Sequence, residues 1–146
     1  MDNYPRKGLR VRCERGVNPK VRKVCLDFCK WIRTEMEFPV RVVIYLKKSN
    51  YIKNITTKEL VSATFFAPYQ KDVEPYIRIS TGDYEELLKE RTEIDALYAY
   101  LESITHELTH YQQWLNDKDF DENEAENNAV ELVDLYHNSE FGLREE

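Results

Sequence analysis

The longest periodic stretch of the chain is TEIDALYAYLESITHELTHYQQWL, residues 92–115. Apolar side chains recur along it at steps of three and four, which places them on one face of an α-helix. We therefore predict one long helix that buries this face against the rest of the domain. The apolar stripe consists of Ile94, Leu97, Leu101, Ile104, Leu108, Tyr111 and Leu115.

A strand and a helix are predicted in the first quarter of the chain. Residues 9–13, LRVRC, alternate apolar and polar side chains as a half-buried strand does. Asn18 followed by Pro19 is typical of a helix N-terminus, because asparagine caps free amides and proline fits the first helical position. This N-terminal helix should end near Phe38, since Pro39 disfavours helix in the residue before it.

Three strands and a final helix complete the pattern. Residues 40–48, 60–67 and 74–80 each contain β-branched or aromatic residues in a pattern that favours strands. After an acidic turn, residues 122–137 carry small and apolar side chains at helical spacing. This order predicts an α+β fold, in which an N-terminal helix, the long helix and a C-terminal helix back a three- to four-stranded mixed sheet.

Length and composition describe one domain. The chain has 146 residues, of which 42% are hydrophobic and 12% aromatic, so we take 1–146 as a single domain with the basic segment 1–17 partly separate. No apolar run approaches the roughly 18 residues that span a bilayer, and the N-terminus lacks the apolar stretch of a secretory signal. Cys13, Cys25 and Cys29 are odd in number and do not suggest a disulfide framework. We expect a soluble cytoplasmic protein with no membrane partner.

The net charge of −6 is unevenly distributed. Residues 1–33 contain ten Lys and Arg against three Asp and Glu, a local charge of +7, which leaves −13 for the remainder. This segment contains no recognisable nucleic-acid motif, so we interpret its charge as a solvated face. A nucleic-acid-binding protein that uses the basic segment is the less favoured alternative.

The motif HELTH, residues 106–110, points to a metal site on the long helix. At about 100° per residue, His106 and His110 project together, away from the apolar stripe. Two imidazoles four residues apart can bind one zinc ion at Zn–N distances of about 2.0–2.1 Å. Glu107 projects in a neighbouring direction, where a carboxylate can hold a metal-bound water without becoming a ligand. The alternative is an ordinary amphipathic helix with two solvent-facing histidines.

A catalytic zinc usually has three protein ligands and one open position. We predict Glu124 as the third ligand, because Ala125 follows it and a small side chain lets two helices approach closely. Asn128, four residues further on, is predicted to hydrogen-bond the outer nitrogen of a ligating imidazole. An alternative role for Glu124 is a capping box begun by Asp121. The fallback ligands are Glu126, Glu131 and His137.

HELTH followed by NEAENN resembles the gluzincin metallopeptidases, whose thermolysin-like members carry HExxH and then a helix with a Glu-Ala-x-x-Asp sequence. ENEAENNAVELV is also similar to a helix of small bacterial gluzincins that cleave repressors, and the minigluzincins are similar in size and element order. The resemblance covers roughly residues 40–137. It implies a zincin-like fold. In this clan the last strand before the active-site helix commonly pairs with an extended substrate, which here would be residues 74–80.

The same resemblance implies roles for individual residues. It makes His106, His110 and Glu124 the ligands of one Zn²⁺ per chain and Glu107 the general base. Asn128 takes the position of an aspartate in the family, so a neutral group would hold the imidazole instead of a charged one.

These features predict a zinc metallopeptidase that hydrolyses peptide bonds of a peptide or protein substrate with a zinc-bound water activated by Glu107. The spacing does not single out the group that stabilises the oxyanion. The alternative is a non-catalytic zincin-fold binding or regulatory module with structural or latent zinc, in which Glu126 or a cysteine replaces the water. Candidates for the oxyanion donor by residue type are Tyr111, Tyr136, His137 and Arg78.

Overall fold

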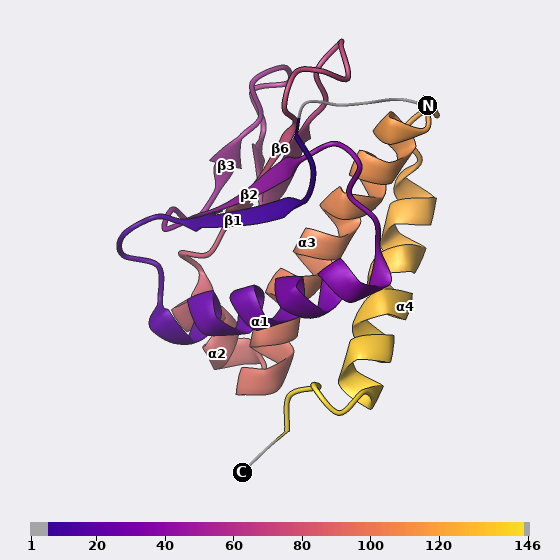
Figure 1. Cartoon of the computed structure of the whole chain (residues 1–146). Helices are drawn as coiled ribbons and strands as arrows, with labels where there is room; N and C mark the ends of the chain where they lie inside the picture. The colour runs from indigo at the N-terminus through magenta and orange to yellow at the C-terminus, as the bar shows by residue number, and fades with distance from the viewer. Residues whose placement is uncertain (1–5, 145–146) are drawn as a thin grey trace.

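The structure of the chain is a computed structural model that describes residues 6–144. In this range the chain forms four helices, a four-stranded sheet and a separate two-stranded sheet, and the helices gather on one side of the larger sheet (Figure 1). The predicted α+β class with a mixed sheet is confirmed. Of the basic segment 1–17, residues 9–13 are built into the sheet, and residues 1–5 lie outside the described range.

The larger sheet has the strand order β1-β2-β6-β5. β1 (Leu9–Cys13), β2 (Val42–Lys47) and β6 (Tyr76–Ser80) are parallel, and β5 (Ala63–Phe66) runs antiparallel to β6 at the edge. Because β6 is paired on both sides, its backbone cannot accept a further strand. The expectation that residues 74–80 pair with a substrate is therefore wrong, and the strand with a free edge on this side is β5.

Residues 60–67, predicted as one strand, are divided between the two sheets. β4 (Leu60–Val61) pairs with β3 (Ile52–Lys53), whereas the following residues join the larger sheet as β5. Ser62 lies at the break, where its carbonyl oxygen accepts hydrogen bonds from the backbone N of Ser80 at 2.9 Å and from the Ser80 hydroxyl at 3.0 Å. These bonds fix the point where the chain passes from one sheet to the other.

The predicted helices are present, with one boundary shifted. The Asn18 side chain accepts hydrogen bonds from the backbone N of Lys20 and Val21, so the predicted N-cap is confirmed. This first helix ends at Glu35, before Phe38, which instead reaches the ring of Tyr111 at a centroid distance of 5.7 Å. No helix of the described residues is both long and apolar enough to cross a membrane. The helices are α1 (Pro19–Glu35), α2 (Tyr84–Glu90), α3 (Glu93–Leu115) and α4 (Glu122–Asn138).

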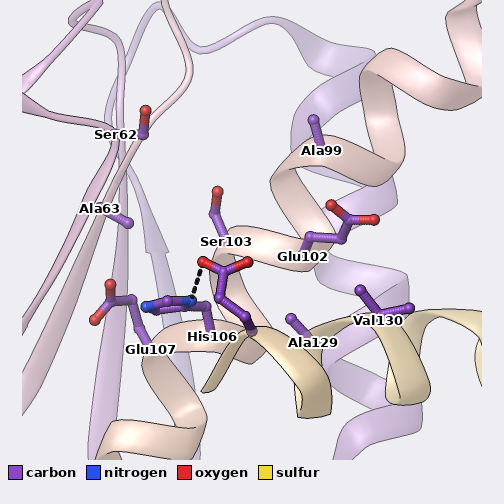
Figure 2. A pocket seen from close by; sticks show the side chains of 10 residues that line it. Ser62, Ala63, Ala99, Glu102, Ser103, His106, Glu107, Ala129 and Val130 are labelled. Carbon is purple, nitrogen blue, oxygen red and sulfur yellow. Dashed lines mark ion pairs between the residues drawn. The ribbon is translucent and has the colours of Figure 1, made fainter. Parts of the chain in front are cut away.

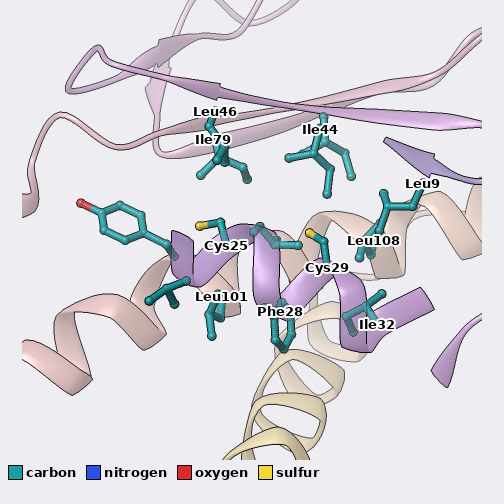
Figure 3. Close-up of a cluster of buried hydrophobic side chains, with 14 of the residues drawn as sticks. Leu9, Cys25, Phe28, Cys29, Ile32, Ile44, Leu46, Ile79, Leu101 and Leu108 are labelled. Atoms are coloured by element: carbon teal, nitrogen blue, oxygen red, sulfur yellow. The ribbon is translucent and has the colours of Figure 1, made fainter. Parts of the chain in front are cut away.

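The core lies between the sheet and the helices α1, α3 and α4. Figure 3 shows Cys25 and Cys29 of α1 directed toward the sheet residues Ile44 and Leu46, with Leu108 of α3 beside them. Both thiols are buried, and burial raises the pKa of Cys25 and raises the pKa of Cys29 to about 12. These cysteines are therefore neutral core residues, which agrees with their helical spacing.

Truncation of a core residue of α3 should destabilise the whole fold. Leu101 is fully buried, so Leu101→Ala should lower the free energy of unfolding by ~2–5 kcal/mol through lost burial and a cavity. Leu135 on α4 is 52% exposed, and Leu135→Ala should change that free energy by less than ~0.5 kcal/mol. Urea-induced unfolding followed by circular dichroism measures both. Equal costs for the two variants would contradict the placement of the core.

Candidate metal centre

The two histidines of HELTH meet one carboxylate from the start of α4. The Nε2 atom of His106 lies 2.9 Å from one oxygen of Glu122, and the Nε2 atom of His110 lies 2.8 Å from the other. One ligand atom from each of these three residues lies within 4.8 Å of the others. Tetrahedral zinc with bonds of about 2.0–2.1 Å places its ligand atoms about 3.3 Å apart. Two imidazoles and a carboxylate at this separation fit a zinc ion after small side-chain shifts.

The turn between α3 and α4 brings Glu122 to the histidines. Asp117 adopts φ 55°, and the backbone N of Lys118 donates to the carbonyl oxygen of Gln113 at 2.8 Å, the pattern of a Schellman C-cap. Asp121 then caps α4, since its side chain accepts a hydrogen bond from the backbone N of Glu124 at 3.1 Å. The chain thus reverses within six residues, and the first residue of α4 faces α3.

Gln113 orients the imidazole of His110 and was not identified from the sequence. Its Oε1 atom lies 2.8 Å from Nδ1 of His110 and accepts from the backbone N of Asp121 at 3.2 Å. Its Nε2 atom donates to the carbonyl oxygen of Asp121 at 3.1 Å and to a Glu124 oxygen at 2.8 Å. These partners define the orientation of the amide, so Nδ1 of His110 carries a proton. In the neutral imidazole the lone pair is then on Nε2, the atom that faces Glu122 and His106.

Glu126 performs the corresponding role for His106. One of its oxygens lies 3.2 Å from Nδ1 of His106, and a dashed line marks this contact in Figure 2. A carboxylate that holds the outer nitrogen of an imidazole increases the basicity of the other nitrogen. Both Nε2 atoms are therefore oriented toward the same point.

The structure does not bring Glu124 to the histidines, although the sequence predicted it as the third ligand. Its backbone N is bonded to Asp121, and its carboxylate accepts from Gln113. The alternative of a cap begun by Asp121 is therefore observed at the backbone of Glu124, whose N–H donates to the Asp121 side chain. The physical reason is helical phase, because two residues along an α-helix rotate a side chain by about 200°. With Asp121 as the cap, Glu122 faces α3, and Glu124 is turned away.

The role predicted for Asn128 is filled by other residues. The outer nitrogens of the two imidazoles are held by Gln113 and Glu126, and half-buried Asn128 lies further along α4. Gln113 could have been found from the sequence, because it lies three residues after His110 on the same helix and such residues are neighbours on the helix surface.

None of the four candidate oxyanion donors points to the histidine pair. The hydroxyl of Tyr111 is buried and donates to the carbonyl oxygen of Val40. The ring of Tyr136 packs in the core, 4.9 Å from the ring of Phe28. Nδ1 of His137 lies 2.8 Å from the hydroxyl of Tyr98, and Arg78 donates to the carbonyl oxygen of Lys53.

Glu107 is buried at the wall of a cleft of about 290 Å³. The side chain is only 7% exposed, and within residues 6–144 no hydrogen bond reaches its carboxylate. Figure 2 shows it next to His106, with Ser62 and Ala63 of the edge-strand region above. Burial raises the pKa of Glu107 to about 7, His110 opposes this rise, and Glu122 adds to it. A carboxyl group with a pKa near neutrality is suited to accept and return a proton.

Comparisons of the chain with protein families, with curated proteins and with solved structures found no match. The chemistry of the site is therefore argued from its own residues.

Replacement of Glu122 should weaken zinc binding far more than replacement of Glu124. Glu122→Gln removes the charge that faces both Nε2 atoms, so we expect at least a tenfold loss of zinc affinity. Glu124→Gln keeps the backbone N that Asp121 caps, and should change the affinity less than about threefold. Competition with a chromogenic zinc chelator measures both. A larger loss in Glu124→Gln would restore the ligand set predicted from the sequence.

Gln113→Met should lower zinc affinity about 10- to 100-fold, because it removes the acceptor that orients His110 while nearly preserving volume. Asn128→Ala serves as the matched control and should bind zinc as the unmodified chain does. The chelator competition is combined with circular dichroism, which reports whether each variant is folded. Equal affinity of Gln113→Met and the unmodified chain would contradict the orienting role.

Proposed function

We propose that this protein is a zinc-dependent metallopeptidase of the gluzincin type that hydrolyses peptide bonds. The observation that carries the proposal is the arrangement of Glu122 between the two Nε2 atoms of His106 and His110, next to a cleft that contains buried Glu107. Two histidines and a glutamate are a donor set of catalytic zinc sites with one position left for water. The third ligand in this proposal is Glu122.

Glu107 is the general base in the proposed reaction. Zinc at this site would supply Lewis-acid chemistry, which polarises a substrate carbonyl and makes a water molecule more acidic. The Glu107 carboxylate accepts the proton of the attacking water and returns it to the leaving amine. Its burial and its lack of a hydrogen-bond partner among the described residues leave both oxygens available for this transfer.

The edge strand β5 supports a peptide as the substrate. Its inner side is paired with β6, and the other side carries backbone groups that can pair with an extended chain. Ser62 and Ala63, where β5 begins, line the same cleft as His106 and Glu107. A peptide added to this edge would pass the general base. Pairing with β5 therefore takes the place of the pairing expected for residues 74–80.

The positions of other potential ligands favour the catalytic proposal over a non-catalytic module with a fully coordinated zinc. Glu126 contacts the outer nitrogen of His106 and is thereby engaged on the far side of that ring. Cys25 and Cys29 are buried in the core, and the Cys13 thiol donates to the carbonyl oxygen of Glu14. The non-catalytic alternative requires Glu126 or a cysteine as a fourth zinc ligand. Each of these side chains instead has contacts away from the two Nε2 atoms.

Glu107→Gln tests the reaction. The variant should retain about one zinc per chain, while kcat on a mixed library of fluorogenic peptides should fall about 10²- to 10⁴-fold, because the amide cannot accept the proton. Glu131, a fallback ligand by sequence, is exposed on α4 and belongs neither to the His106, His110 and Glu122 group nor to the cleft, so Glu131→Gln is the matched control and should cleave like the unmodified chain. Zinc content is measured by elemental analysis on the same samples. Undiminished hydrolysis by Glu107→Gln would refute the proposed mechanism.

A further inference from the structure

The cleft beside Glu107 has two further carboxylates in its walls. Glu102 lies on α3 one turn before His106 (Figure 2), and Glu126 belongs to α4. Two small side chains, Ala99 and Ala129, also line the cleft and leave room between the helices. With Glu107, three carboxylates therefore border a single space of about 290 Å³.

Further acidic residues surround Glu102 beyond the cleft itself. Partial burial raises the pKa of Glu102, and Arg91 opposes the rise. The negative charges of Glu126, Asp134 and Asp95 raise it further. A second cavity of about 500 Å³ shares Ala99 and Glu102 with the cleft and contains Asp95 and Asp134 in its wall. The space between α3 and α4 thus has an excess of negative charge that Arg91 only partly balances.

Glu107 is an independent indication that this space takes a ligand. Its carboxyl side chain is 7% exposed, lines the cleft and has no hydrogen bond from the described residues. Its oxygens are open to the cleft, so a molecule bound there can supply the hydrogen-bond partner that the described residues do not. That molecule meets Glu102 and Glu126 in the same cleft.

We infer that the cleft binds a cationic side chain, lysine or arginine, of the substrate residue next to the scissile bond, and that Glu102 determines this specificity. The inference rests on the proposed function, because it treats the cleft as the substrate side of the metal centre. A bound peptide removes water from Glu102 and Glu126, and the charge of a cationic side chain compensates for this loss of hydration. A neutral side chain would leave these carboxylates desolvated without compensation. The volume suits one long side chain and is at the lower end for sites that hold a whole small molecule.

Binding to a variant that lacks the general base tests the inference separately from catalysis. Zinc-loaded Glu107→Gln protein is titrated into fluorescein-labelled alanine-based hexapeptides that carry one central Lys, Gln or Glu. We expect the Lys probe to bind about tenfold more tightly than the Gln probe, with the Glu probe weakest. The ratio should fall with added salt, because screening weakens the attraction between exposed charges.

Two double variants, each built on Glu107→Gln, test which residue causes the preference for the Lys probe. Adding Glu102→Gln should reduce the ratio between the Lys and Gln probes to about one, and adding Glu131→Gln should leave it near tenfold. Equal binding of the Lys and Gln probes, or a ratio that Glu102→Gln does not reduce, would overturn the inference.

Cleavage of the same peptides by the unmodified, zinc-loaded chain distinguishes failure of the cationic specificity from failure of the proposed function. Cleavage of the Lys and Gln peptides at equal kcat/KM overturns the cationic specificity and leaves the peptidase proposal standing. A Glu102-dependent binding preference without cleavage of any peptide overturns the peptidase proposal and the position next to a scissile bond, and leaves a site that only binds cationic side chains.

Discussion

The candidate metal centre depends on the contact between α3 and α4. The two histidines lie on one helix and the carboxylate that joins them lies on the other, so the three groups meet only if the helices pack closely. Ala125 and Ala129 are buried in this interface, where small side chains permit the approach. A larger residue at either position would separate Glu122 from the histidines and dismantle the site without changing any of its chemical groups.

Burial removes water from the polar groups of the site, and these groups differ in whether a protein hydrogen bond replaces the water. Gln113 and His110 are nearly inaccessible, and their polar atoms are engaged in a chain of hydrogen bonds that ends at Asp121 and Glu124. Such a satisfied network rigidifies the groups it connects. Glu107 has a different arrangement, because no hydrogen bond from the described residues reaches its carboxylate and its oxygens are open to the cleft. Glu107 faces the cleft, where the substrate and water of the proposed reaction would bind, and the hydrogen-bonded groups face the protein.

The sequence predicted the elements of this fold better than their relative orientation. The apolar stripe of α3, the Asn18 cap and the existence of α4 follow from local spacing, and local spacing is a property of the chain alone. The division of residues 60–67 between two sheets depends on the hydrogen bonds from Ser80 to Ser62, which join residues eighteen positions apart. No local pattern contains that information.

The choice between Glu122 and Glu124 shows the same limit at the site. The sequence predicted a glutamate of the last helix as third ligand, and the proposed ligand Glu122 also lies there, but the phase of α4 relative to α3 depends on the left-handed Asp117 and on which acidic residue caps the helix. Asp121 and Asp119 are both suitable caps by residue type, and a shift of the cap changes which glutamate faces the histidines. Gln113 was missed for a different reason. It lies on the motif's own helix, whereas all the predicted partners of the histidines lie on the following helix.

Glu126 belongs both to the candidate metal centre and to the acidic wall of the cleft. Its carboxylate holds Nδ1 of His106 and also forms part of the acidic wall that would receive a cationic side chain. If the cleft binds a cation as inferred, the same carboxylate would divide its hydrogen-bonding capacity between the substrate and the imidazole. A carboxylate that gives up part of its contact with Nδ1 would make the imidazole a weaker donor to a metal. Among the described residues no hydrogen bond or ion pair joins Glu102 to either histidine, so Glu102 can attract a cation without this effect, and for this reason we assign the specificity to Glu102 rather than to Glu126.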